Sequence, residues 1–241
     1  MRFYVGQTRG ERTPLQQHLA DMGAGEVVQR GDLPPRRGPY FYDNRAFADW
    51  RAGQPFDEVQ FELDMRWLCR HVGRCDWGRG VRNLATGQIE PVPLPPPDFI
   101  VLPDLVAQGR ASLEFSASYV VGERAPLGGY PAGAPLYLAV QDGMSIAEVF
   151  EVVCNLGIGG IFVGGTLEWK IKTAAQWVRA AHRLGRPVHI GRVGTVDRLR
   201  WARRIGADSI DSSLPLWSTE NLERFERGLA DTPQLGLWEA A

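Results

Sequence analysis

The sequence of 241 residues has few cysteines, few lysines and no long apolar run. Its three cysteines, Cys69, Cys75 and Cys154, cannot complete an even disulfide framework, and their spacing fits no compact zinc site. No apolar stretch has the length of a membrane span, and the start MRFYVGQTRG lacks the apolar core of a signal peptide. We therefore expect a cytoplasmic protein without a membrane partner, a metal or another cofactor.

Only two lysines, Lys170 and Lys172, occur among the 27 basic residues, and the others are arginine. Arginine suits bidentate contacts to phosphates and bases, although a GC-rich coding sequence produces the same excess. Eight arginines and one acid, Asp197, lie within 179–204, and the segment 66–82 is also basic. Because the net charge of the whole chain is only -1, this concentration indicates a polyanionic partner. For each arginine taken alone, a solvated helix face is the alternative.

Short runs rich in β-branched and aromatic residues alternate with helical patterns along the chain. Strands are predicted at 3–6, 26–28, 40–43, 98–103, 136–141, 160–164, 188–193 and 208–211. Helices are predicted at 14–22, 57–72, 109–120, 145–156, 170–184, 195–205 and 218–228. This alternation, over nearly the usual length of about 250 residues, predicts an α/β protein with a single (β/α)8 TIM barrel over 1–241. A doubly wound open sheet is the alternative fold, and the Pro- and Gly-rich stretch 74–97 is predicted to be a long loop.

Polar residues follow the predicted strands at the ends where barrel enzymes carry their chemistry. These ends provide Asp43, Asp104, Gln141, Asp142, Gly164, Gly165, Gly191, Arg192 and Asp211. Two carboxylates across one pocket suit chemistry at an anomeric carbon, because one attacks the carbon while the other protonates and later deprotonates the leaving group. A further carboxylate beside an amide and a backbone N–H can bind a purine edge. For Asp43 and Asp211 taken singly, a helix cap or turn is the alternative, and Asp208 is expected to be structural.

Four segments of the chain resemble the tRNA-guanine transglycosylase superfamily. The stretch VGTVDRLRWARRIGADSIDSSLP (193–215) is similar to the run that carries the nucleophilic aspartate of that family. DNRAF (43–47) is similar to its Asp-x-Gly-Gly-Phe, AVQDG (139–143) to its Val-Gln-Gly-Gly, and VGG (163–165) to its Gly-Gly motif. The four segments occur in the family's order between about residues 40 and 225.

The resemblance implies a role for each matching residue. Asp211 falls on the nucleophile and Asp43 on the general acid/base. The implied base-binding residues are Phe47, which covers the base, and Asp104, Gln141, Gly164 and Gly165, with Asp104 assigned by its position after the fourth strand. Arg192, Lys170 and Lys172 are expected to contact the nucleic acid, with helix-surface charge as the alternative for the two lysines.

Departures from the family pattern narrow the expected substrate. Arg45-Ala46 replaces two glycines, Asp142 replaces another, and the Cys-rich zinc site of the tRNA enzymes is missing. The chain is more similar to the phage-type 7-deazaguanine DNA transglycosylases, which would act in the host cytoplasm. The resemblance implies a pentosyltransferase that exchanges guanine in DNA for a 7-deazaguanine base such as preQ0 through a covalent aspartyl-sugar intermediate. The alternatives are the same exchange on tRNA, a glycosidase or phosphosugar barrel enzyme, and a non-catalytic nucleic-acid-binding barrel.

Two further expectations concern residues outside these motifs. Arg74, Arg79 and Arg82 are expected to line the path of the nucleic acid in the loop 74–97. His189, on the seventh strand, is expected to be a core histidine rather than a catalyst.

Overall fold

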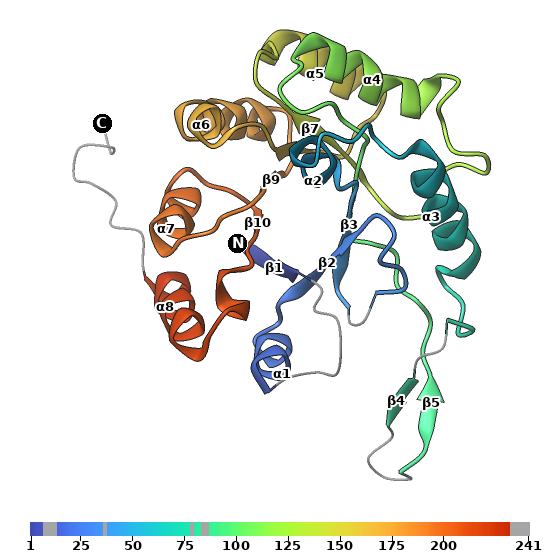
Figure 1. The fold of residues 1–241 in the computed structure, drawn as a ribbon, viewed down its shortest axis with the longest axis vertical. Coiled ribbons are helices and arrows are strands. Elements are labelled where there is room, and N and C mark those ends of the chain that lie inside the picture. Colours follow the sequence, from blue (N-terminus) through green and yellow to red (C-terminus); the bar gives the residue numbers. More distant parts are fainter. Residues whose placement is uncertain (7–13, 36–37, 78–79, 83–86, 232–241) are drawn as a thin grey trace.

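The barrel strands define the fold. The computed structural model describes residues 1–6, 14–35, 38–77, 80–82 and 87–231. Eight parallel strands close into a ring in the order β1-β10-β9-β8-β7-β6-β3-β2, with helices around it (Figure 1). The strands are β1 (Arg2–Gly6), β2 (Gly25–Gln29), β3 (Tyr40–Asp43), β6 (Ile100–Val101), β7 (Leu136–Val140), β8 (Gly160–Val163), β9 (Val188–Ile190) and β10 (Ser209–Asp211). The predicted (β/α)8 barrel is confirmed, and the open sheet is wrong because β1 pairs with β10 and closes the ring.

Helices cover the outside of the ring and overlap the predicted helices. They are α1 (Pro14–Asp21), α3 (Glu58–His71), α4 (Arg110–Val121), α5 (Ile146–Asn155), α6 (Leu167–Arg183), α7 (Val196–Arg204) and α8 (Thr219–Ala230). Thr195 and Ser218 cap α7 and α8 because their hydroxyl oxygens accept the amides of Arg198 and Asn221. Ser145 precedes α5 without capping it through its side chain. Within the described ranges, no helix has both the length and the apolar character needed to cross a membrane.

Two short elements near the ends of the strands are not predicted from the sequence. Helix α2 (Ala46–Arg51) follows β3, and the 3-10 helix η1 (Leu214–Leu216) follows β10. Both are too short for a helical hydrophobic period to appear in the sequence. Helix α2 positions the site because it carries Phe47 to the cavity at the strand ends.

The interior of the barrel is filled by a layer of aromatic rings. Phe99 stacks on Phe41 and on Tyr137, with ring centroids 4.5 and 4.1 Å apart, and Tyr4 meets Phe41 edge-on at 4.9 Å. All four residues are buried, and burial of one such ring contributes roughly 1.5–3 kcal/mol. Side chains alternate along a strand, so the residue two positions after an inward-facing ring also faces inward. Asp43 follows Phe41 in this way, and the aromatic layer lies directly beneath the polar strand ends.

The predicted long loop 74–97 contains a β-hairpin. Strands β4 (Gly80–Arg82) and β5 (Ile89–Pro91) pair antiparallel and project away from the barrel (Figure 1). Proline is tolerated here because an isolated two-stranded ribbon leaves one edge of each strand unpaired. Arg74 forms an ion pair with Asp76 at 3.4 Å. Arg79 and the side chain of Arg82 lie outside the described residues, so their expected role stays a prediction.

Gly25 tests how tightly the barrel interior is packed. A Cβ atom at Gly25 would lie 2.2 Å from Cδ1 of Tyr4, whose ring is held by Phe41 and whose hydroxyl donates to Asp98 at 2.8 Å. We expect Gly25→Ala to lower the free energy of unfolding by about 1–3 kcal/mol, measured by urea denaturation. The control is Gly6→Ala on β1, where the nearest atom would be 3.9 Å away. Equal losses in the two variants would contradict this account.

Candidate active site

The C-terminal ends of the barrel strands surround one cavity. Seven of its lining residues are the predicted catalytic and base-binding residues, and Arg192 is an eighth: Asp43, Phe47, Asp104, Gln141, Gly164, Gly165, Asp211 and Arg192. They come from segments that are far apart in the sequence, and the parallel strands bring them together because every strand ends at the same face. The side chains combine three carboxylates, an amide, an aromatic ring and a guanidinium, which is a set suited to binding a polar ring compound.

Asp211 ends β10 and is hydrogen bonded through one carboxylate oxygen. Its Oδ1 lies 2.9 Å from Nε2 of His189 and accepts the backbone amide of Arg192 at 3.1 Å. Burial raises the pKa of the Asp211 carboxyl, but the hydrogen bond from His189, the Arg192 amide and the charge of Lys170 together hold this pKa below its ordinary value. No donor among the described residues contacts Oδ2. Asp211 therefore has a lowered pKa and one oxygen held in place by two donors.

His189 is buried, as expected, but its partner is the candidate nucleophile. Burial lowers the pKa of the imidazole, so the ring is neutral at neutral pH. Because Asp211 is ionised, Nε2 of His189 carries the proton and donates to it, while Nδ1 accepts from the Ser209 hydroxyl at 2.9 Å. The ring of Phe162 stacks on the imidazole at 4.9 Å. In the sheet, His189 of β9 pairs with Ser209 of β10, and Asp211 lies two residues after Ser209 on the same face. Knowledge of this register would have indicated the contact between His189 and Asp211.

Asp43 has the opposite electrostatic setting from Asp211. Burial raises the pKa of the Asp43 carboxyl. The backbone amide of Arg45 donates to Asp43 at 3.0 Å and lowers this pKa, whereas the charge of Asp211 raises it further. The side-chain amide of Gln29 donates to the other carboxyl oxygen of Asp43 at 3.3 Å. Two carboxyls in one cavity with pKa values shifted in opposite directions can divide the roles of proton donor and nucleophile.

Asp104 lies deeper in the cavity and accepts two amide donors. Asn44 Nδ2 donates to Oδ1 at 2.6 Å, and Gln141 Nε2 donates to Oδ2. Burial raises the pKa of Asp104 to about 7. The Gly165 amide, which the resemblance assigns to a bound base, donates here to Gln141 Oε1 at 2.9 Å. Asp104, Gln141 and Gly165 thus form a continuous chain of hydrogen bonds across the cavity.

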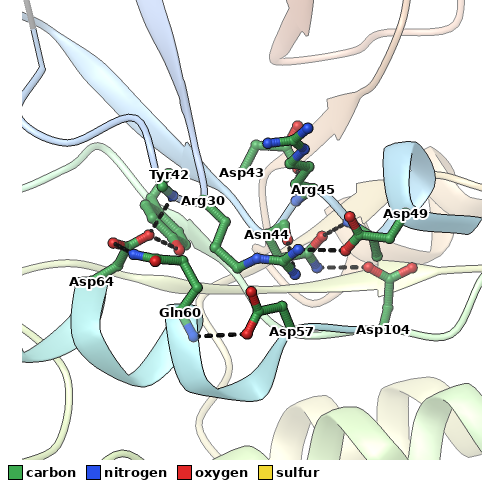
Figure 2. A network of polar contacts seen from close by, with 12 residues as sticks. Arg30, Tyr42, Asp43, Asn44, Arg45, Asp49, Asp57, Gln60, Asp64 and Asp104 are labelled. Carbon is green, nitrogen blue, oxygen red and sulfur yellow. Dashed lines mark hydrogen bonds and ion pairs between the residues drawn. The ribbon is translucent and has the colours of Figure 1, made fainter. Parts of the chain in front are cut away.

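A buried ion pair fixes helix α2 beside this chain. Arg30, at the end of β2, contacts Asp49 of α2 at 2.5 Å and donates to the carbonyl of Asn44 at 3.1 Å (Figure 2). The side chains of Arg30 and Asp49 are only 5% and 14% exposed, so loss of either partner would leave an uncompensated charge. Arg45, at the start of α2, has φ 65°, in the left-handed region that favours glycine. This backbone conformation precedes Phe47, which lines the cavity.

The two lysines predicted to contact nucleic acid have different positions. Lys170 on α6 is 3% exposed, and its ammonium donates to the carbonyl of Gly191. Burial lowers the pKa of Lys170 to about 7. Its side chain therefore supports the loop after β9, and its expected contact with a nucleic acid stays a prediction. Lys172 is exposed and pairs with Glu168 at 2.6 Å, as expected of helix-surface charge.

Asp142 and Asp208 are structural carboxylates. Asp142, which replaces a family glycine, accepts the Thr166 amide at 2.7 Å and its hydroxyl at 2.5 Å, so it holds the start of α6. Asp208 accepts the Val188 amide and contacts His182 Nε2, each at 2.8 Å, as expected. In the part of the chain that the structure describes, no three His, Cys, Asp or Glu side chains gather as a metal site.

The raised pKa of Asp104 predicts a pH dependence of stability. The folded-state pKa of about 7 exceeds the ordinary value of 3.8, so the unfolded chain ionises first as the pH rises. The stability that the protonated Asp104 contributes is fully present below about pH 4 and is lost by about pH 7, where both the folded and the unfolded chain have ionised this carboxyl. We expect Asp104→Asn to become more stable relative to the wild type across this window, measured by urea unfolding at several pH values. Asp197→Asn, at an exposed position on α7, is the control, and a constant difference between Asp104→Asn and wild type would contradict the assignment.

Comparison with known proteins assigns no family to this chain. A scan against protein-family models finds no match, and a search among curated proteins finds none either. The function is therefore argued from the residues of the cavity.

Proposed function

We propose that the protein is a transglycosylase that exchanges guanine in DNA for a 7-deazaguanine base through a covalent intermediate on Asp211. The observation that carries the proposal is the pair of carboxyls with opposite pKa shifts in one cavity with Asp104, Gln141 and Gly165. The lowered pKa of Asp211 suits nucleophilic attack, and the raised pKa of Asp43 suits proton donation to a leaving group.

In the first half-reaction, a deoxyguanosine flipped from the duplex enters the cavity. Oδ2 of Asp211 attacks C1′ and forms the sugar ester, while the bond from C1′ to guanine N9 breaks. The electron pair of that bond leaves with guanine, and Asp43 supplies the proton that neutralises it. Phe47 covers the base, and Asp104 accepts from its N1–H and N2–H donors. Binding of these donors favours the ionised form of Asp104, which the buried cavity otherwise disfavours.

In the second half-reaction, the incoming deazapurine takes the place of guanine. Asp43, now a carboxylate, removes the proton from the ring nitrogen that attacks C1′, and the Asp211 carboxylate leaves. Two displacements at C1′ retain the configuration of the sugar. His189 and the Arg192 amide hold Oδ1 throughout, so they direct Oδ2 at the sugar and stabilise the departing carboxylate.

DNA is proposed over tRNA because the sequence lacks the Cys-rich motif that the resemblance associates with tRNA enzymes. The arginine-rich composition supports a polyanionic substrate of either kind. We place this activity in the cytoplasm. The same exchange on tRNA remains the second candidate.

The base exchange itself is the first test. Duplex DNA or tRNA carrying labelled guanine is incubated with the protein and preQ0, and release of label is followed. We expect release from DNA, a loss of more than about a thousandfold in Asp211→Asn, and a loss of about a hundredfold or more in Asp43→Asn.

Each alternative has its own outcome in this assay. Release from tRNA alone would transfer the proposal to RNA. Release from neither, with nucleic-acid binding unchanged in Asp211→Asn, would favour the non-catalytic barrel. Circular dichroism spectra of the two variants control for folding.

The contact between His189 and Asp211 predicts a shift in the pH profile of exchange. Without the donor, the pKa of Asp211 rises, so we expect the acid limb of the kcat/KM profile to move to higher pH in His189→Leu. His189→Gln places an amide donor near the position of Nε2 and should restore part of the wild-type profile. A slower rate in both variants with no movement of the acid limb would mean that His189 only fills space.

A further inference from the structure

Arg192 lies across the mouth of the cavity on a constrained backbone. Its φ is 60°, in the left-handed region, and its amide donates to Asp211. The guanidinium carbon Cζ lies 3.4 Å from the centroid of the Phe47 ring, and Nη2 donates to the carbonyl of Gly165 at 2.5 Å. The guanidinium is therefore held both on its face and at its edge.

Two adjacent cavities share Arg192, together with Asp43, Phe47 and Asp211. The inner cavity, with Asp104 and Gln141, has a volume of about 50 Å³, and the outer cavity, with Gln29 and Ser213, about 300 Å³. Arg192 lines both. Because one water takes about 30 Å³ in the liquid, a purine does not fit in the inner cavity while the guanidinium lies there.

The chemistry of the guanidinium matches that of the proposed base. A guanidinium is planar and stacks on aromatic faces, and its N–C–N donors resemble the N1–H, C2 and N2–H edge of guanine. It stacks on Phe47, the residue expected to cover the base, and it contacts Gly165, a residue expected to bind the base edge. Burial lowers the pKa of Arg192, and attraction to Asp211, Asp43 and Asp104 opposes this effect and favours the charged form.

We propose that Arg192 is an internal occupant of the base position, which a guanine-like ring must displace, and that the displaced guanidinium binds a backbone phosphate of the nucleic acid in the outer cavity. This proposal rests on the proposed function and adds a specificity-determining role for Arg192. A free base must displace the guanidinium without a phosphate to receive it. A nucleotide in a strand supplies both groups, so the nucleic acid binds in preference to the free base when Asp211 carries no sugar.

Binding of free 7-cyano-7-deazaguanine without nucleic acid tests the displacement. Calorimetry compares the wild type with Arg192→Ala, Arg192→Lys and the control Arg224→Ala, an exposed residue on α8 that pairs with Glu220. A ligand that competes with a conformation populated at 90% loses about tenfold in affinity. We expect both Arg192 variants to bind the base at least about tenfold more tightly than the wild type, and Arg224→Ala to bind it equally.

The phosphate contact is tested by the salt dependence of DNA binding. The slope of log K against log salt is negative, and one lost phosphate contact makes it shallower by about one. We expect this change in Arg192→Ala and a wild-type slope in Arg192→Lys. Unchanged or weaker base binding in the Arg192 variants would overturn the displacement, and an unchanged slope in Arg192→Ala would overturn the phosphate contact.

The base-exchange assay on the wild type is recorded in the same series, so that the two proposals can fail separately. Exchange without tighter base binding in the variants removes only the role of Arg192. Absence of exchange together with absence of base binding in every variant removes both proposals.

Discussion

The burial of three carboxyls above an aromatic layer is the constraint on which the rest of the site depends. A carboxylate out of water must be paired, hydrogen bonded or protonated. The barrel uses a different solution for each one. Asp211 stays charged because His189 and the Arg192 amide donate to it, Asp104 accepts two side-chain amides and has a pKa of about 7, and Asp43 has a raised pKa beside Asp211. Each carboxyl accepts two donors, so the distribution of protons follows from the kind of donor and from the charges beside each carboxyl: Lys170 beside Asp211, Asp211 beside Asp43, and Asp43 beside Asp104.

A second set of contacts keeps those donors in position. Arg30 and Asp49 join β2 to α2, and Asn44 joins α2 to Asp104. Asp64 on α3 accepts the Gly31 amide and the Tyr42 hydroxyl, each at 2.7 Å, on the outer side of the same strands (Figure 2). Polar contacts therefore join the outer side of β3 to the cavity lining through Gly31, Arg30 and Asn44.

The sequence predicted the barrel and its strand ends well because both depend on short-range patterns. Alternation of apolar runs identified the eight strands, and the residues after the third to the eighth run identified much of the cavity lining. Features that depend on neighbouring strands were missed. The contact of His189 with Asp211 depends on the register between β9 and β10, and the Asp142 contact to Thr166 depends on two loops meeting. Helix α2 and the hairpin β4–β5 were missed because six residues and a Pro- and Gly-rich stretch carry little periodic signal.

The left-handed backbone at Arg192 is less stable with arginine than with glycine, although the proposed function needs the guanidinium. Glycine is the relaxed residue at a φ of 60°, and arginine there costs about 1 kcal/mol relative to it. Replacement by glycine would therefore relieve the backbone while removing the guanidinium from the cavity. Selection for a more stable fold alone would favour that replacement. An arginine at this position therefore goes against the preference of the backbone, and its presence or absence in related chains would distinguish selection on the cavity from selection on the fold.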